Sequence, residues 1–149
     1  YSGEEIRYCL DLADVEILVF GPEFVTRMDA IRSQTPGVKT MFFVGRGGPD
    51  YTEDCLTYMS FCSSAAPPVA LDEEDDAAIY FSSGTTGFPK AILHCHRALA
   101  RSCQTEQHHH GQTRSDVFLC IPPLYHTGAK MHWFGSLLSG SRAVLLRGV

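Results

Sequence analysis

The chain has 149 residues, 44% of them hydrophobic, and a formal net charge of −5. A chain of this length can bury a core of its own, since folding removes roughly 68–70% of the unfolded surface from water. The composition excludes a disordered or collagen-like protein. No apolar run approaches the roughly 20 residues of a membrane-spanning helix, so we expect no membrane span.

Charge is distributed unevenly along the chain. Residues 1–76 carry 5 basic and 15 acidic residues, whereas residues 77–149 carry 7 basic and 2 acidic residues and all 7 histidines. The basic second half can face an anionic small molecule, while the acidic first half can simply be a solvated face. Nucleic acid is not expected as a partner, because no Lys/Arg-rich run or aromatic-interleaved basic stripe is present.

The first half alternates helix-like and strand-like patterns. Residues 2–5 (Ser-Gly-Glu-Glu) have the form of a capping box that begins a helix. Residues 15–20 predict a buried strand, Pro22 can open a second helix, and residues 38–44 predict another strand. A third helix is expected over residues 52–62. We expect three of its side chains to face inward: Cys55, Met59 and Cys62.

The second half continues the alternation after a linker-like stretch at residues 63–68 and an acidic run at residues 72–76. We expect strands at residues 77–81, 92–96, 117–121 and 143–146, and helices at residues 98–107 and 130–138. Such alternation favours an α/β fold with a layered, largely parallel sheet flanked by helices. We expect residues 1–149 to form a single α/β unit with a possible soft boundary at residues 63–76.

Six cysteines are scattered through the chain, and no CxxC pair occurs. They are Cys9, Cys55, Cys62, Cys95, Cys103 and Cys120. Reduced structural thiols in a cytoplasmic protein fit this pattern better than disulfides do.

The segment with the clearest chemical signal is residues 80–90, Tyr-Phe-Ser-Ser-Gly-Thr-Thr-Gly-Phe-Pro-Lys. Glycines let the backbone approach a ligand closely, consecutive backbone N–H groups can form an anion-binding nest, and hydroxyls with a lysine can bind phosphate oxygens. The alternative is an ordinary hairpin loop with a solvated lysine. The candidate phosphate-binding residues are Ser82, Ser83, Gly84, Thr85, Thr86, Gly87 and Lys90.

This segment is not a Walker A loop, in which the lysine opens a helix. Here Lys90 follows Pro89, which biases Phe88 toward an extended conformation. We therefore expect Lys90 to lead into a strand, which gives a strand–loop–strand hairpin.

Residues 80–90 resemble the phosphate-binding signature of adenylate-forming enzymes, the AMP-dependent synthetase and ligase superfamily, whose common form is (Y/F)-T-S-G-T-T-G-x-P-K-G. Ser82 stands where Thr is usual and keeps the hydroxyl, and Ala91 stands where Gly is usual. Residues 123–128 (Pro-Leu-Tyr-His-Thr-Gly) resemble the family's next motif, and residues 1–20 resemble the helix and strand that open this region. The resemblance is to the acyl-CoA synthetase branch in particular.

The resemblance implies a ligase that activates a carboxylic acid with ATP to an acyl-adenylate, releases pyrophosphate, and then forms a thioester with coenzyme A. By the same resemblance, Lys90 and His126 would be catalytic residues, and His126 would lie with Trp133 in the substrate pocket. The loop would bind ATP, and Mg²⁺ would have its main ligand outside this chain. The structural alternatives are a satisfied histidine after a strand and a tryptophan that belongs to the core.

The remaining histidines are interpreted structurally. The run His108–His110 does not share one helix face as i, i+4 pairs do, and no set of cysteine or acidic ligands accompanies it, so we read an exposed helix end and no metal site. His94 and His96 alternate with Ile92 along an expected strand and are read as structural.

Later motifs of the family, such as Thr-Gly-Asp, do not occur in this sequence. We therefore expect the chain to be a part of the large N-terminal domain, without the C-terminal domain, and to be inactive alone. A sheet taken out of a larger domain exposes apolar surface, so self-association is expected. Two other interpretations stay open: a non-catalytic phosphate-binding or interaction module, and an adenylation domain that serves a carrier protein.

Overall fold

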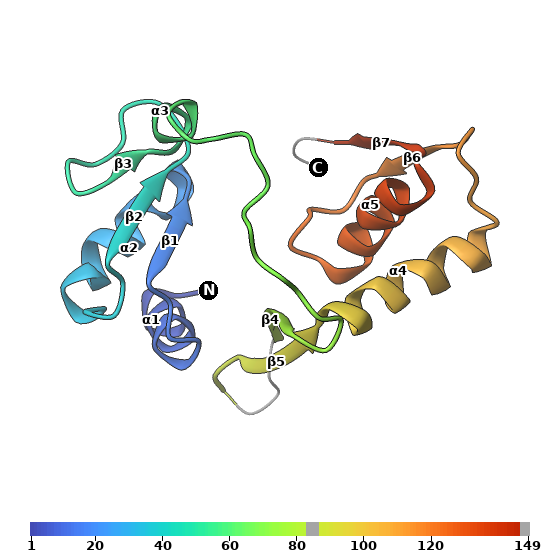
Figure 1. Ribbon diagram of the computed structural model, residues 1–149. Helices are drawn as coiled ribbons and strands as arrows, with labels where there is room; N and C mark the ends of the chain where they lie inside the picture. Colours follow the sequence, from blue (N-terminus) through green and yellow to red (C-terminus); the bar gives the residue numbers. More distant parts are fainter. Residues whose placement is uncertain (83–86, 147–149) are drawn as a thin grey trace. The chain divides into compact units, whose positions relative to one another are not determined.

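A computed structural model describes residues 1–82 and 87–146. Helices and strands alternate along the chain, and the strand pairs β1–β2, β2–β3 and β6–β7 are parallel (Figure 1). This arrangement confirms the predicted α/β fold with parallel sheets flanked by helices. Among the residues described, no helix is both long and apolar enough to span a membrane.

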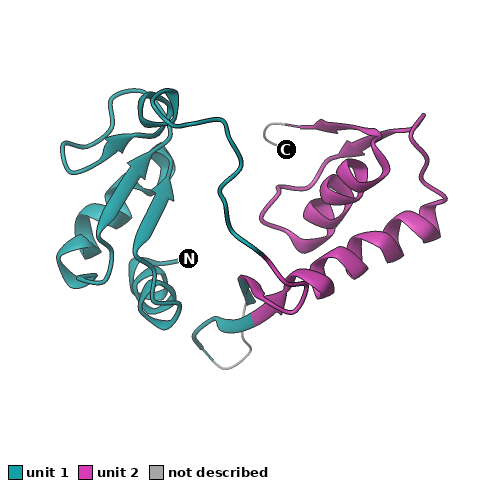
Figure 2. Ribbon diagram, viewed as in Figure 1, with its two compact units in different colours: residues 1–70, 79–92 teal, residues 71–78, 93–149 magenta. Residues whose placement is uncertain are grey.

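The chain divides into two compact units, shown in Figure 2. Unit 1 consists of residues 1–70 and 79–92, and unit 2 of residues 71–78 and 93–149. The chain passes between the units three times: after residue 70, which lies within the stretch 63–76, and after residues 78 and 92, which lie beyond it. That the chain forms one domain stays a prediction, and each unit is described by itself.

Unit 1 contains a three-stranded sheet in the order β1-β2-β3. Its elements are α1 (Gly3–Leu12), β1 (Ile17–Phe20), a 3₁₀ turn (Pro22–Phe24), α2 (Val25–Ile31), a second 3₁₀ turn (Arg32–Gln34), β2 (Thr40–Phe43), β3 (Glu53–Asp54) and α3 (Cys55–Ser60). The predicted capping box is present: Glu5 N–H donates to Ser2 Oγ at 3.3 Å, and Ser2 N–H donates to the Glu5 carboxylate at 2.6 Å.

The core of unit 1 lies between α2 and one face of the sheet. Phe20 and Phe43 are register partners in β1 and β2, and their rings meet edge to face with centroids 5.8 Å apart. Met28 and Ile31 of α2 complete this buried cluster. The prediction that residues 15–20 form a fully buried strand is wrong, because Ile17 is 60% exposed. Successive strand side chains alternate between faces, and only the face that carries Phe20 is buried.

The third predicted helix begins later than expected. Glu53 and Asp54 form β3 and pair with the end of β2, and the Asp54 carboxylate accepts a hydrogen bond from Thr57 N–H at 2.7 Å. Asp54 is therefore the N-cap, and α3 can start only at Cys55. Cys55 is half-buried, but Met59 and Cys62 are exposed, so the prediction that these two side chains face the core is wrong.

Unit 2 holds α4 (His96–His110), β6 (Val117–Cys120), α5 (Thr127–Ser139) and β7 (Arg142–Leu145). β6 and β7 pair in parallel from Val117↔Arg142 to Cys120↔Leu145. Gly111 and Gly140 end the two helices in the left-handed conformation, which glycine adopts without the Cβ penalty.

A separate two-stranded sheet pairs β4 (Asp76–Ser82) with β5 (Lys90–Cys95). The strand predicted over residues 92–96 ends one residue earlier, because His96 begins α4 and its N–H donates to the Asp75 carbonyl. His96 therefore does not continue the strand face with His94. Arg97 pairs with the carboxylates of Glu73 and Glu74, so part of the acidic run contacts the first turn of α4.

Met28 tests the core of unit 1. Its side chain is 1% exposed, so Met28→Ala is expected to lower the free energy of unfolding by about 2–5 kcal/mol through lost burial and a cavity. Met59→Ala serves as the matched control, since Met59 is 62% exposed and should change stability by no more than about 0.5 kcal/mol. Urea unfolding followed by circular dichroism measures both, and equal losses would contradict this core.

Candidate functional site

The β4–β5 pair flanks the segment that the sequence singles out. β4 ends at Ser82 and β5 begins at Lys90, and the two strands are hydrogen-bonded neighbours. This arrangement confirms the predicted strand–loop–strand order, in which the lysine starts a strand and not a helix. Four candidate residues lie outside the described part of the chain: Ser83, Gly84, Thr85 and Thr86.

Gly87 has a backbone conformation that favours glycine. Its φ is +118°, and a Cβ built on it would meet nothing within 4 Å among the residues described. Glycine is therefore favoured here because of the positive φ and not because a side chain would clash with neighbouring atoms. Pro89 is buried and Lys90 is exposed, so the lysine side chain can reach solvent and a dissolved anion.

The N-terminal segment contacts this ribbon beside the connection between its two strands. The centroids of the Phe88 ring and of the Tyr8 ring of α1 lie 4.8 Å apart. The Tyr1 hydroxyl donates to the Phe81 carbonyl at 3.2 Å. Both contacts belong to unit 1. Sequence reasoning missed these two tyrosines, because a contact across about eighty residues of chain leaves no local pattern.

His126 stands at the N-terminus of α5. It is the N-cap residue, its N–H donates to the Pro123 carbonyl at 2.9 Å, and its own carbonyl accepts from Lys130 N–H. The imidazole is exposed and makes no side-chain cap, and its ring lies 4.7 Å from the Tyr125 ring. A helix N-terminus carries partial positive charge, which suits an anionic group such as a carboxylate.

Trp133 is half-buried in α5 and stacks on Phe134 with ring centroids 5.1 Å apart. It lies seven residues after the N-cap His126, about two helical turns along α5. The substrate-pocket role of this pair stays a prediction. Lys90 belongs to unit 1, whereas His126 and Trp133 belong to unit 2, and each is described within its own unit.

The cysteines offer little nucleophilic character. All six are free thiols. Burial raises the pKa of the Cys103 thiol and that of the Cys120 thiol above the ordinary value. A raised pKa leaves less of the reactive thiolate at neutral pH, so these two residues act as small apolar groups of the core.

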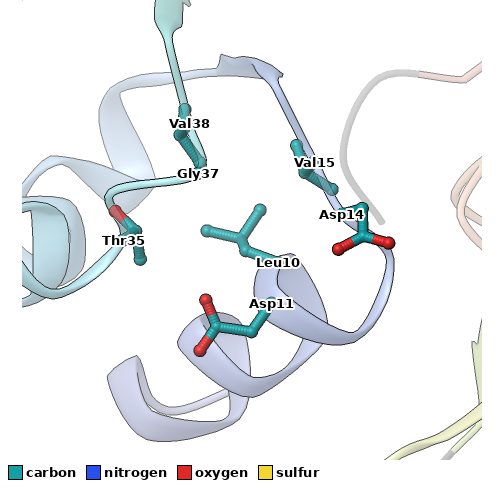
Figure 3. A pocket seen from close by; sticks show the side chains of 7 residues that line it. All are labelled: Leu10, Asp11, Asp14, Val15, Thr35, Gly37 and Val38. Atoms are coloured by element: carbon teal, nitrogen blue, oxygen red, sulfur yellow. The ribbon is translucent and has the colours of Figure 1, made fainter.

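A small cavity of about 130 Å³ lies in unit 1 between the end of α1 and the turn before β2 (Figure 3). It is lined by Leu10, Asp11, Asp14, Val15, Thr35, Gly37 and Val38. The Asp11 carboxylate pairs with Arg7 at 3.3 Å, and the Thr35 hydroxyl donates to the Arg32 carbonyl at 3.1 Å. Two of its polar groups are therefore already paired with neighbouring residues of the same unit. None of the predicted site residues lines the cavity.

The profile of the AMP-binding enzyme family matches residues 1–149. A long-chain-fatty-acid–CoA ligase of Thermus thermophilus is 30% identical over 146 residues, which cover 97% of this chain and 26% of that protein. 4-Coumarate–CoA ligase 5 of Oryza sativa subsp. japonica is 32% identical over 151 residues, covering 96% of this chain and 26% of the relative. The chain thus spans about a quarter of the length of these relatives.

Solved structures give the same fold. The anthranilate CoA ligase AuaEII in complex with anthranoyl-AMP superposes on all of this chain with a TM-score of 0.92 at 23% identity, using 29% of that structure. The N-terminal domain of FACL13 from Mycobacterium tuberculosis superposes on all of it with a TM-score of 0.88 at 20% identity, using 36% of that structure. The fold of the chain is therefore that of part of an N-terminal domain of adenylate-forming enzymes, as the sequence predicts.

The backbone of Gly87 can be tested by substitution. Gly87→Ala is expected to destabilise the chain by about 1–2 kcal/mol, because the added Cβ disfavours a positive φ. Gly128→Ala is the matched control: its Cβ also meets nothing within 4 Å, but Gly128 lies in α5, where alanine should be neutral or stabilising by up to about 1 kcal/mol. Urea unfolding measures both, and a neutral Gly87→Ala would refute the strained backbone.

Proposed function

The chain belongs to the AMP-binding enzyme family, and we propose that the protein containing it is an ATP-dependent acid–thiol ligase of the acyl-CoA synthetase type. The observation that carries this proposal is the segment at residues 80–90, whose flanking strands β4 and β5 are paired so that Ser82 and Lys90 bracket the glycine- and hydroxyl-rich connection. Such a connection suits the phosphates of a nucleotide better than an apolar ligand.

The proposed reaction has two steps. A carboxylate oxygen attacks the α-phosphorus of ATP, and the bond from that phosphorus to the bridging oxygen breaks, so that pyrophosphate leaves and an acyl-adenylate forms. A thiolate sulfur then attacks the acyl carbon, and AMP leaves with the electron pair of the broken C–O bond. Because carboxylate and triphosphate repel each other, the protein must supply positioning and positive charge.

Lys90 is the charged group that we assign to the phosphates. It is exposed at the first position of β5, where an ammonium on a four-carbon stem can reach a phosphate oxygen as a point charge. Gly87 has no side chain, so an anion can approach its backbone N–H closely. Ser82, with Ser83, Thr85 and Thr86, offers hydroxyl donors, and Gly84 completes the glycine pair.

Mg²⁺ would neutralise part of the triphosphate charge. Of the residues described at this end of the ribbon (82 and 87–90), none is a carboxylate, and a carboxylate is the protein ligand that Mg²⁺ usually takes. The residues present can bind the phosphates but do not by themselves make a magnesium site. We propose that its main ligand lies in a part of the protein outside this chain.

His126 and Trp133 are assigned to the acid. The exposed imidazole at the positive end of α5 can donate a hydrogen bond to the carboxylate, and Trp133, two turns along the same helix, can contact the acyl or aryl group. Coenzyme A is proposed as the acceptor, which the names of the two CoA-ligase relatives favour over a carrier protein. The activity is proposed for the whole protein, since the chain covers 26% of each of these relatives.

Lys90→Ala tests the phosphate assignment. In the longest native form of the protein, carboxylate-dependent exchange between ATP and pyrophosphate is measured on a panel of short-chain, long-chain and aromatic acids. We expect exchange with one class of acid and a loss of about 10²-fold or more in Lys90→Ala, comparable to the removal of one transition-state donor. Lys39→Ala is the control, because Lys39 is an exposed lysine paired with Glu16 and should leave exchange unchanged.

Two outcomes would contradict the proposal. A folded protein that exchanges pyrophosphate with no acid on the panel would instead support a non-catalytic phosphate-binding module. Equal effects of Lys90→Ala and Lys39→Ala would remove Lys90 from the site even if the protein is a ligase.

His126→Ala tests the carboxylate assignment. Loss of a hydrogen bond to a charged group typically costs about 1.5–3 kcal/mol, so kcat/KM for the acid should fall roughly 10–100-fold while KM for ATP stays unchanged. His108→Ala is the matched control, since His108 is also exposed but lies near the end of α4. A parallel increase in the KM values of both substrates would show that His126 acts on the fold of α5 and not on the acid.

A further inference from the structure

Three side chains of unit 2 bring metal-ligand atoms together. Glu106 and His110 lie four residues apart on α4, and His132 lies on α5. One ligand atom from each residue lies within 4.8 Å of the others. The Glu106 carboxylate is 3.7 Å from His110 Nε2, and the rings of His110 and His132 have centroids 5.1 Å apart. A carboxylate and two imidazoles thus meet at one place between two helices.

The helices that carry these residues pack closely beside the cluster. The Gln107 side-chain amide donates to the Gly135 carbonyl, and Cys103 Sγ lies 3.6 Å from Met131 Sδ. A Cβ added to Gly135 would come within 3.2 Å of Gln107 Cγ, so glycine permits this approach of α5 to α4. The separation of the cluster's backbones is therefore set by buried packing and not by the three ligand residues themselves.

His132 has a buried ring nitrogen, Nδ1, without a hydrogen-bond partner in the described part of the chain. Its ring stacks on Phe118 of β6 with centroids 4.4 Å apart. Buried polar side-chain atoms are usually partnered, and a neutral imidazole nitrogen without a partner is available to bind a metal.

We propose that Glu106, His110 and His132 bind one divalent transition-metal ion of the zinc class, which joins α4 to α5. Two histidines and a glutamate are a known ligand set for Zn²⁺, with a fourth position left to water. The ligand atoms of a tetrahedral Zn²⁺ site lie about 3.4 Å apart, since Zn–N and Zn–O bonds are about 2.0–2.2 Å. His110 is exposed and Glu106 is half-exposed, so rotation of these side chains can close the present spacing.

This proposal departs from the expectation of no metal site, which rested on the spacing of the three consecutive histidines and on the lack of accompanying cysteine or acidic ligands. The structure places the Glu106 carboxylate beside His110. His108 and His109 do not belong to the cluster, and the third ligand comes from a different helix. None of the three cluster residues is among those assigned to ATP or the acid, so the proposal does not depend on the proposed reaction. A bound ion would stabilise the packed pair of helices by mass action, since it binds the folded state.

Zinc titration of the full chain tests the site, with binding followed by calorimetry and by the shift in thermal unfolding. His110→Gln and Glu106→Gln each remove one ligand at an accessible position, and His108→Gln is the matched control on the same helix. We expect one Zn²⁺ per cluster, a rise in the unfolding temperature, and affinity about tenfold or more weaker in both ligand variants, since even the outer-shell partners of metal ligands typically contribute 10–100-fold. His108→Gln should bind as the unmodified chain does.

X-ray absorption at the zinc edge distinguishes zinc bound at this site from zinc bound to any of the six free thiols. The expected spectrum has nitrogen and oxygen neighbours at about 2.0–2.2 Å, whereas thiolate ligands would lie at about 2.3 Å. Sulfur neighbours, or equal zinc affinity in His110→Gln and His108→Gln, would overturn the proposal. Circular dichroism of each variant confirms that it is folded before its affinity is compared.

Discussion

Hydrogen bonding between β4 and β5 constrains everything proposed for the phosphate site. Because the two strands are neighbours, Ser82 and Lys90 bracket the same short connection, and the lysine leaves the connection at the first position of a strand. Contacts from Tyr1 and Tyr8 hold the ends of this ribbon against the N-terminal segment. A flexible lysine fixed at its backbone in this way would add positive charge beside the proposed triphosphate, and would lose less positional freedom on binding than a lysine on an untethered loop.

Signals that are local in the sequence predicted much of the fold. The capping box at Ser2 and the pairing of strands on either side of the glycine- and hydroxyl-rich connection each depend on neighbouring residues, so one sequence was enough to predict them. β3 was missed because a two-residue strand has no periodicity, and its Asp54 then caps the following helix. The exposure of Ile17 and Met59 depends on which elements cover a face, and this information lies in tertiary structure.

The residues of the candidate sites also fall into those that a local pattern predicts and those that only a tertiary contact reveals. Lys90 and Gly87 were predicted as site residues because the composition and spacing of residues 80–90 suit a phosphate, and His126 because residues 123–128 resemble a family motif. Tyr8 and the cluster of Glu106, His110 and His132 were missed, since each depends on a contact between separate elements. The histidine run lies at the C-terminal end of α4, where His110 is a proposed ligand, but the third proposed ligand, His132, lies on α5. Sequence spacing alone cannot supply a ligand from a second helix.

Helix α5 connects the two proposals through one rigid element. It begins after His126, whose imidazole is assigned to the acid, and its middle packs on α4 through Met131 and Gly135 beside the proposed metal ligand His132. An ion bound there would reduce the motion of α5 relative to α4, and with it the freedom of the imidazole at the N-terminus of that helix. The effect of the ion would therefore fall on the proposed binding of the acid at the helix terminus, while the phosphate contacts proposed for Lys90, a residue of unit 1, depend on β4–β5 pairing.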